Sequence, residues 1–355
     1  MDIEPSPVVL DNGSGNLRAG FAGQDSPDVF FSSLDRRAFY IGNEAQSRRS
    51  ILSLVHPVTG GVVTNWDDME VIWTYAFNQL STLPGSQPVL ISEAPLNPRP
   101  NREKMCETMF EKFDVPAFYV SIAAVLALYA SGRGSGIVLD SGEGTTHVVP
   151  VYQGYTFPHA ITRVGFSGCD LTDYMIRLLG ERGLIFSSSG QRETVREMKE
   201  SLCYVSIESQ TSRDISPQQY NLPDGRVIDL SDECCKVPEA LFNPQEMGIN
   251  RAGIQHTVLD TINKCDIDVR KDFMSNIILS GGNTLFNGFP QRLRKEIQDT
   301  SSTRSKAVVV SALERDSFVW LGGSILASLS TFQHVWVTKQ DYGENGFSTI
   351  FRRDP

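Results

Sequence analysis

The feature that most constrains this chain is a short motif that occurs twice. Leu10-Asp11-Asn12-Gly13-Ser14-Gly15 is matched by Leu139-Asp140-Ser141-Gly142-Glu143-Gly144, and in each copy Asp-x-Gly-x-Gly stands between two apolar runs. This pattern predicts a strand, a glycine turn and a returning strand. The two aspartates lie 129 residues apart (140 − 11). That is a domain-sized spacing, so the sequence predicts one folding unit used twice, with two acidic hairpins facing each other across a cleft.

Length and charge limit the class of protein. With 355 residues, 40% of them hydrophobic, the chain exceeds what one core usually organises, so two lobes are expected. A net charge of −10 argues against general nucleic-acid binding, which needs clustered Lys and Arg. The six cysteines show no C-x-x-C spacing, so neither a zinc site nor a disulfide framework is expected.

The N-terminal residues Met1 to Pro5 carry acid where a secretory signal needs basic residues, and the apolar stretch 120–130 is too short to cross a bilayer. We therefore expect a soluble, intracellular protein without membrane insertion.

Strands and helices are expected to alternate along the chain. The expected strands lie at 8–23 (two strands around the turn), 88–93, 136–139, 148–151, 155–157, 276–280 and 308–310. The expected helices begin at 65 and after 97–101, and cover 121–131, 171–179, 191–205, 289–298 and 320–329. This alternation, with a hairpin in each repeat, predicts an α/β protein with mixed sheets.

The two hairpins have the chemistry of a phosphate site. Glycine permits positive φ and brings backbone N–H groups close to an anion. Residues 13–15 and 142–144 would hold phosphates from two sides, while Asp11 and Asp140 would face a divalent cation through its water shell. One such hairpin is usually an ordinary tight turn, but two copies at domain spacing favour the functional interpretation. Neither the P-loop nor the dinucleotide fingerprint fits.

Two further signals are weaker. Gly281-Gly282 follows a buried strand and precedes a helix, so a flat ligand could lie on its backbone near a helix N-terminus; a plain strand-to-helix turn is an equal interpretation. Arg196, Lys199 and Glu200 have the spacing of one helix face, where a solvated row of ion pairs is the alternative.

Longer motifs resemble the actin family from one end of the chain to the other. They are DNGSG (11–15), AGFAG (19–23), NWDDMEVIW (65–73), EAPLNPRPNREKM (93–105), LYASGR (128–133), LDSGEGTTHVVPVYQGY (139–155), KESLCYV (199–205), LPDG (222–225), KCDIDVRKD (264–272), ILSGGNT (278–284) and GGSILASLSTF (322–332). The resemblance implies the actin-like ATPase fold, with two lobes around a cleft for ATP or ADP and Mg²⁺ or Ca²⁺. The first lobe would comprise 1–131 with 325–355, including a small outer part at about 27–57, and the second 132–324.

The resemblance also implies roles for single residues. Asp11 and Asp140 match the aspartates around the cation, and His147 matches the histidine near the attacking water. The implied nucleotide-binding residues are Gly13, Ser14, Gly15, Asn16, Arg18, Gly142, Glu143, Gly144, Thr145, Arg196, Lys199, Glu200, Gly281, Gly282 and Phe286, the last replacing a tyrosine. The hydrophobic cleft where actin-binding proteins and neighbouring subunits dock matches Tyr129, Gly132, Leu326 and Leu329; these four could equally be core.

The chain departs from the family pattern inside the implied site. The family's glutamine that orients the attacking water corresponds to Ala123 in this sequence. Losing that polar group would lower the rate of hydrolysis by about 10²–10⁴-fold. A phosphate-contacting lysine becomes Arg18, a bulkier planar cation. An aspartate becomes Glu143, and a lysine near the adenine becomes Asp316. These changes predict weaker nucleotide binding and very slow hydrolysis.

Other departures oppose filament assembly. Compared with the family pattern, the segment 27–41 lacks part of the loop that inserts into the next subunit. Glu246 replaces a large apolar residue in the family segment that crosses between the strands of a filament, and burying its unpaired carboxylate there would cost several kcal/mol. The family's histidine beside the phosphate-sensing loop falls on Gly60, and the chain ends after Phe351 without Lys-Cys-Phe.

Two functions compete on this resemblance. The favoured one is a divergent actin-like protein that binds nucleotide, is at most a slow ATPase, and serves the cytoskeleton as a structural or complex-forming subunit in the cytoplasm, with the nucleus as an alternative location. Its partners would be actin-binding or complex-subunit proteins, or actin itself. The second is a conventional filament-forming ATPase. A sugar kinase or chaperone of the same superfamily would need a substrate domain, which the sequence lacks.

Overall fold

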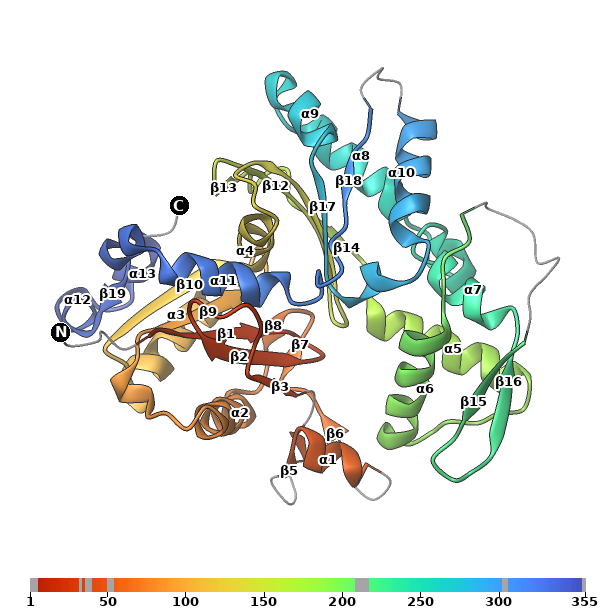
Figure 1. Cartoon of the computed structure of the whole chain (residues 1–355), viewed down its shortest axis with the longest axis horizontal. Coiled ribbons are helices and arrows are strands. Elements are labelled where there is room, and N and C mark those ends of the chain that lie inside the picture. Colours follow the sequence, from red (N-terminus) through yellow and green to blue (C-terminus); the bar gives the residue numbers. More distant parts are fainter. Residues whose placement is uncertain are drawn as a thin grey trace.

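Two mixed β-sheets form the centre of the molecule, and helices cover them (Figure 1). The structure, a computed structural model, describes residues 6–31, 34–35, 40–49, 54–207, 217–301 and 306–352. The first sheet has the order β19 (Val337–Thr338), β10 (Ala117–Ile122), β9 (Val89–Glu93), β1 (Val8–Asn12), β2 (Leu17–Phe21) and β3 (Val29–Phe31). The second has the order β13 (Tyr155–Thr156), β12 (Thr146–Tyr152), β11 (Gly136–Ser141), β17 (Ile277–Ser280) and β18 (Val309–Val310), and β14 (Thr162–Val164) also pairs with β12.

The two sheets repeat one arrangement, which confirms the predicted duplicated α/β unit. β1 forms an antiparallel hairpin with β2 and lies parallel to β9. In the same way β11 forms an antiparallel hairpin with β12 and lies parallel to β17. Each central strand is almost fully buried, as its continuous apolar run requires. Asp11 and Asp140 therefore occupy equivalent places near the ends of two equivalent strands.

Local sequence explains the first long helix. α2 (Trp66–Gln79) begins after Asn65, whose Oδ1 accepts a hydrogen bond of 3.1 Å from the backbone N–H of Asp68. This caps one of the helix's unpaired N–H groups, and the acidic residues of its first turn suit the helix dipole. Met69, Trp73 and Phe77 recur at helical spacing and are buried, so this face packs on the first sheet.

The remaining helices lie before and after the second hairpin in the sequence. The helices before the second hairpin are α1 (Asn43–Ser47), α3 (Arg99–Glu107), which continues into a π-helical turn at Thr108–Lys112, and α4 (Ala123–Ala130). Those after it are α5 (Gly168–Glu181), α6 (Ser189–Leu202), α7 (Glu233–Glu239), α8 (Ile254–Lys264), α9 (Ile267–Met274), α10 (Phe289–Thr300), α11 (Phe318–Ser328), α12 (Lys339–Asn345) and α13 (Ser348–Arg352).

Helices α4 and α11 form a shared core between the sheets. Side chains from both helices cluster with Val9 of the first sheet and Val138 of the second. The indole Nε1 of Trp320 donates to the carbonyl of Val9 at 3.1 Å. Gly322 lets the helices touch, because a Cβ atom there would lie 1.8 Å from the carbonyl oxygen of Leu126. The two sheets are thus joined by a packed hinge.

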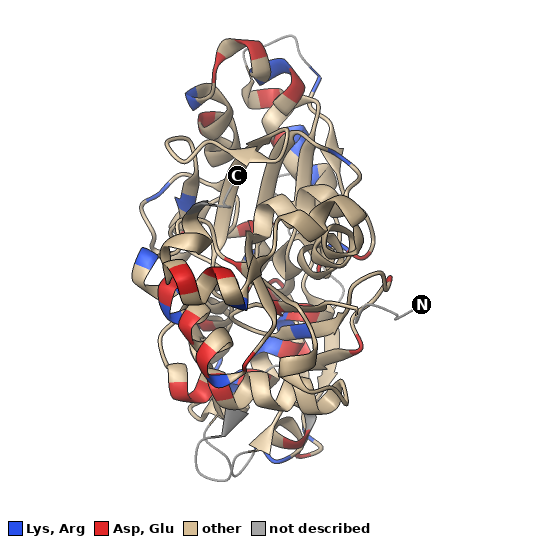
Figure 2. Cartoon of the chain, turned by 90° about the vertical axis from the view of Figure 1, so that its left-hand side faces the viewer, with Lys and Arg blue, Asp and Glu red and all other residues tan. Residues whose placement is uncertain are grey.

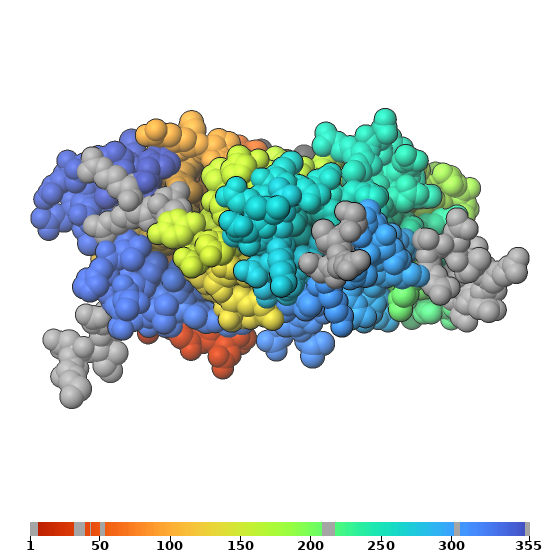
Figure 3. Space-filling model, turned by 90° about the horizontal axis from the view of Figure 1, so that it is seen from above, coloured from red at the N-terminus to blue at the C-terminus, as the bar shows by residue number. Residues whose placement is uncertain are grey.

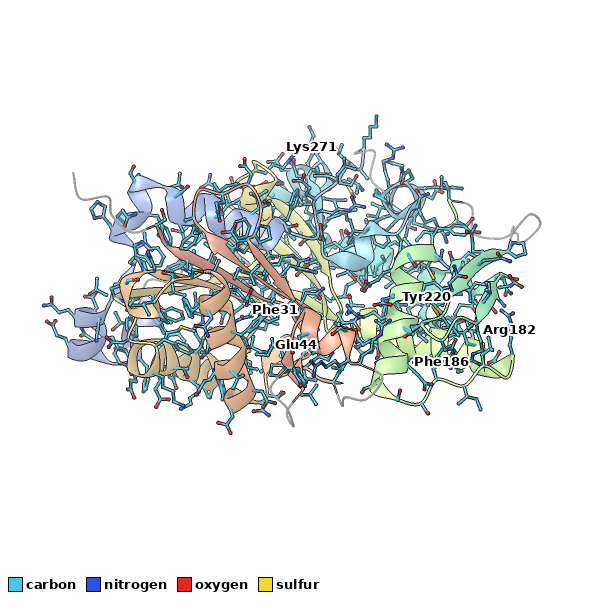
Figure 4. The ribbon with its side chains drawn as sticks, turned by 60° about the horizontal axis from the view of Figure 1, so that its bottom comes forward. Phe31, Glu44, Arg182, Phe186, Tyr220 and Lys271 are labelled. Carbon is cyan, nitrogen blue, oxygen red and sulfur yellow. The ribbon has the colours of Figure 1, made fainter. Side chains whose placement is uncertain are left out.

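Small sheets extend the molecule on either side of the cleft. On one side β4 (Leu34–Asp35) pairs with β5 (Tyr40–Ile41) and β6 (Leu54–Val55), and β7 (Val58–Thr59) pairs with β8 (Val62–Val63). On the other β15 (Gln218–Asn221) pairs with β16 (Val227–Leu230). The two sides meet where α1 approaches α6 (Figure 4): Arg49 Nη2 contacts Glu197 Oε2 at 2.9 Å, and the N–H of Leu54 donates to Ser189 Oγ at 3.2 Å.

The C-terminal segment returns to the first sheet. β19 pairs antiparallel with β10, and the guanidinium carbon of Arg99 lies 4.5 Å from the centre of the Phe351 ring. Figure 3 shows this segment, in blue, against residues of the first hundred or so, in orange.

Acidic and basic residues are interspersed on the helices seen in Figure 2. No described helix has the length and apolar character needed to cross a membrane.

One expected helix needs correction, one expected boundary falls inside a helix, and two expectations concern residues outside those described. The helix predicted at 121–131 begins at Ala123, because Ser121 and Ile122 complete β10, a strand not predicted from the sequence, in register with Ser92 and Glu93 of β9. The lobe boundary predicted between 324 and 325 falls inside α11. Residues 32–33 and 36–39 of the shortened segment, and 353–355 of the C-terminus, lie outside the described residues.

The contact between α4 and α11 yields a stability prediction. Replacing Gly322 with Val should lower the free energy of unfolding by at least about 3 kcal/mol, because the added side chain overlaps backbone that cannot move away. Gly343→Ala in α12 is the control, since no atom lies within 4 Å of its added Cβ; it should be neutral or stabilise by up to about 1 kcal/mol. Urea unfolding followed by circular dichroism measures both, and an unchanged midpoint for the Gly322 variant would contradict the packing.

Candidate functional site

The two glycine hairpins meet face to face. A Cβ atom added at Gly144 would lie 2.3 Å from Oγ of Ser14, and one added at Gly15 would lie 2.8 Å from Cβ of Glu143. Real Cβ atoms do not approach other atoms so closely, so the absence of a side chain at these two positions lets the hairpins interlock. The predicted opposition of the two motifs across a cleft is present in the structure.

Surrounding hydrogen bonds hold each hairpin in shape. Asn283 Nδ2 donates to the carbonyl of Gly142 at 2.8 Å and to Ser141 Oγ at 3.0 Å. On the other hairpin, the N–H of Gly61 donates to Ser14 Oγ at 3.1 Å. Both loops are therefore preorganised by segments distant in sequence, which lowers the cost of ordering them around a ligand.

A cavity of about 280 Å³ lies between the hairpins. It brings together all but one of the residues that the sequence assigned to cation, nucleotide or water: Asp11, Gly13, Ser14, Gly15, Asn16, Arg18, Ala123, Asp140, Gly142, Glu143, Gly144, Thr145, His147, Arg196, Glu200, Gly281, Gly282 and Phe286. These residues come from five separate stretches of chain. Asp316 also lines the cavity.

Lys199 is the exception. Its side chain is 1% exposed and donates to the carbonyl of Gly168 at 2.8 Å and to Thr172 Oγ1 at 3.0 Å. It also contacts Glu143 Oε2 at 3.3 Å. The lysine lies behind the hairpin and anchors the longer glutamate, whereas the other two residues of the same helix face, Arg196 and Glu200, reach the cavity.

Gly281 is required by its conformation and by its neighbours. Its φ is +85°, and an added Cβ would lie 2.4 Å from the carbonyl oxygen of Ser141. The turn therefore passes directly over the end of β11. Gly282 has open space where a Cβ would be, so the backbone there presents a bare surface to the cavity, as the sequence suggested.

Two carboxylates face the cavity, that of the buried Asp11 and that of the half-buried Asp140. Ser92 Oγ donates to Asp11 Oδ1 at 2.6 Å, and Arg18 Nη1 lies 3.7 Å from Asp11 Oδ2. Burial raises the pKa of Asp11, and the arginine and serine oppose the shift. Burial also raises the pKa of Asp140, to about 6, and the neighbouring charge of Asp11 adds to that rise. The charge of Arg18 offsets only part of this cost, so a cation between the two acids would further favour their charged forms.

The described residues contain no cluster of three or more His, Cys, Asp or Glu side chains able to hold a metal ion. The two aspartates alone cannot complete a coordination shell. They fit a Mg²⁺ or Ca²⁺ ion that keeps most of its water and takes further oxygens from a phosphate ligand.

His147 lies opposite Asp140 in the β11–β12 ladder and is 2% exposed. Within the described part of the chain its Nδ1 has no hydrogen-bond partner, although it is buried at the cavity wall. Burial lowers the pKa of His147 to about 4, and the charge of Arg163 contributes. The ring is therefore neutral at physiological pH, with one polar atom left for a ligand or water.

Ala123 is the first residue of α4 and offers only a methyl group to the cavity. Its side chain can neither accept nor donate a hydrogen bond, so that side chain cannot orient a water molecule. The geometry agrees with the expectation drawn from the sequence for this position.

The cavity also contains residues that the sequence did not single out. Ser92 and Glu93 end β9, which lies parallel to β1, and Asn283 follows the glycine pair. Ligands bind outside the carboxyl ends of parallel strands, and that rule could have found Ser92 and Glu93. Phe30 gives no comparable signal, because it depends on the pairing of β2 with β3.

The four residues of the implied docking cleft lie outside the cavity. Tyr129 and Gly132 stand at the C-terminal end of α4, and Leu326 and Leu329 at that of α11. Leu329 is 46% exposed, and Tyr129 and Leu326 are half-buried against the shared core. They are therefore partly core and partly surface.

The remaining departures have local explanations. Gly60 has φ +59°, and an added Cβ would lie 2.6 Å from Arg163 Nη2, which donates to the Gly60 carbonyl at 3.2 Å. No histidine fits there without a rearrangement. Glu246 is exposed in this single chain, so its predicted burial would arise only in an assembly.

Two sheets built on one repeated hairpin unit, with a polar cavity between the hairpins, define a two-lobed α/β protein with a central cleft. A family model described as Actin matches residues 3–355. The chain belongs to the actin family.

The state of His147 can be tested directly. In an NMR titration its ring should stay neutral from pH 7.5 down to about pH 5 and become protonated only near pH 4, because burial disfavours the charged form. The exposed His159 supplies an internal reference signal. A midpoint above pH 6 for His147 would show that the ring is hydrated or paired, contrary to the structure.

Proposed function

We propose that this chain is a divergent actin-like protein that binds ATP or ADP with Mg²⁺ or Ca²⁺ and acts in the cytoskeleton as a structural or complex-forming subunit with impaired hydrolysis. The observation that carries the proposal is the cavity between the interlocked hairpins, with Asp11 and Asp140 on its wall. Membership of the actin family supports a nucleotide as the ligand.

The residues present fit such a ligand. The hairpins 13–15 and 142–144 would hold phosphate oxygens from two sides, and Asp11 and Asp140 would hold a hydrated cation. Gly281, Gly282 and Phe286 would lie against the nucleoside, and Arg196 and Glu200 at its polar edge. The cation, when bound, would neutralise phosphate charge.

Slow hydrolysis follows from two cavity residues. An attacking water needs a group that orients it and a group that handles its proton. His147 is neutral, and its Nδ1 has no hydrogen-bond partner within the described part of the chain, so it can contact water. Ala123 cannot take the orienting part, and the chain is therefore proposed to retain nucleotide mainly as a structural ligand.

The proposed working surface is the end of α4 and α11. The side chains or backbone of four residues would receive actin-binding proteins, other subunits of a complex, or actin itself: Tyr129, Gly132, Leu326 and Leu329.

In this proposal the first lobe comprises residues 1–131 with 325–355, the second comprises 132–324, and α11 crosses the boundary between them. The shortened segment at 27–41 and the exposed Glu246 oppose conventional self-assembly in the cytoplasm.

The first test is cation-dependent binding. Mg-ATP at about 100 times its Kd should raise the melting temperature by several degrees. Because the pKa of Asp140 is about 6, the carboxylate is available above that pH, and Mg²⁺ affinity should fall by up to about tenfold per pH unit below it. Asp140→Asn should bind more weakly and lack this part of the pH dependence; the ligand's own titration is common to both proteins. No thermal shift with ATP or ADP at any pH would contradict the proposal.

The second test restores the missing amide. Ala123→Gln should raise the rate of phosphate release by about 10²–10⁴ if water orientation is what the chain lacks. Ala123→Met has similar length without the amide and should give no gain. Equal rates for the two variants would show that another residue limits turnover.

The same preparations separate the two candidate functions. At raised concentration in Mg-ATP the unmodified chain should stay in the supernatant on high-speed sedimentation. Robust pelleting with release of phosphate would favour the conventional filament-forming ATPase.

A further inference from the structure

Two charged residues of the cavity, Arg18 and Asp316, pair with each other across 298 positions of sequence. Arg18 Nη2 lies 3.3 Å from Asp316 Oδ2, and the guanidinium carbon lies 5.0 Å from the centre of the Phe30 ring. With the contact to Asp11 already described, the guanidinium is held between two carboxylates and a ring. Only 12% of its side chain is exposed.

The position of Asp316 is set by the arginine before it. Arg315 is buried; its Nε donates to Thr284 Oγ1 at 3.1 Å, and its Nη2 donates to the Thr284 carbonyl at 2.8 Å. The N–H of Gly281 donates back to the Arg315 carbonyl at 3.2 Å. These bonds fasten the segment to the glycine turn, so the aspartate is presented to the cavity by a fixed backbone.

The charge balance of the cavity makes this pair important for an anionic ligand. Arg18 and Arg196 are the two Lys or Arg residues among its described lining, and the acids are Asp11, Glu93, Asp140, Glu143, Glu200 and Asp316. Arg196 is engaged by Glu193 at 2.6 Å and by Glu200 at 3.5 Å. Arg18 is thus the main positively charged side chain available to a phosphate group, and its Nη2 already contacts the carboxylate of Asp316.

We propose that Asp316 acts as an internal competitor for Arg18, and that this ion pair sets how tightly the cavity holds phosphate and how strongly it prefers more phosphates to fewer. The inference rests on the proposed function. A phosphate oxygen and the Asp316 carboxylate seek the same planar N–H donors. A phosphorylated ligand must displace or share that contact, whereas an uncharged nucleoside need not.

The test is calorimetric binding of ATP, ADP and adenosine, each with Mg²⁺, to Asp316→Asn. This variant keeps the shape of the side chain and removes its charge. Because the ion pair is partly exposed, we expect removal of the Asp316 charge to tighten ATP binding about fivefold, to tighten ADP binding less and to leave adenosine binding unchanged. Glu314→Gln is the matched control, because it removes an exposed carboxylate two residues away and should change none of the three affinities.

A double-mutant cycle locates the effect. In an Arg18→Met background the gain from Asp316→Asn should disappear, because no guanidinium remains to be released. An equal gain in that background would overturn the inference and indicate that the charge of Asp316 acts on the ligand at long range. An equal gain for adenosine would also overturn it and indicate an effect on binding of the base. If Arg18→Met binds too weakly to measure, confinement of the gain to phosphorylated ligands decides the matter.

Two other outcomes are informative. Unchanged ATP affinity in Asp316→Asn, with normal binding by the unmodified chain, would overturn the inference and leave the proposed function intact. Loss of all nucleotide binding in the unmodified chain would overturn both. Thermal unfolding without ligand checks that each variant folds, and Asp316→Ser replaces Asp316→Asn if the latter does not.

Discussion

The close approach of two glycine loops is the constraint on which the rest of this structure depends. Gly15 packs on Glu143, and Gly144 packs on Ser14, at distances that admit no further carbon atom. This contact sets the separation of the two sheets at the cavity, while α4 and α11 set it at the hinge. Any side chain at either glycine would push apart the carboxylates of Asp11 and Asp140, which in the proposed function must both reach the same ligand.

Electrostatics explains why the proposed ligand carries both signs of charge. Acids outnumber bases around the cavity, and burial raises the pKa of both central aspartates. A cation relieves that cost, but a free cation would lack enough ligands from the described residues. A phosphate ligand with a bound cation supplies both the positive charge and the additional oxygen ligands. A metal–nucleotide therefore fits the proposed function better than either component alone.

Much of the site could be predicted from the sequence because its parts are short local motifs. Asp-x-Gly-x-Gly between two apolar runs favours a hairpin, and its repetition indicated the duplicated fold. Lys199 shows the limit: helical spacing placed it on a face with Arg196, but packing turned it behind Glu143. Ser121 and Ile122 show another, because an apolar run before a helix does not reveal where strand pairing with β9 ends.

What the sequence determined by itself was the pair of acidic glycine turns, the strands that flank them, and the absence of a polar side chain at Ala123. Each of these depends on backbone preferences and residue chemistry within a few positions. Only the tertiary structure decided that Arg18 pairs with Asp316 and that the buried Nδ1 of His147 has no hydrogen-bond partner among the residues that the structure describes. Contacts across hundreds of residues depend on how sheets pack, and local propensity carries no information about that packing.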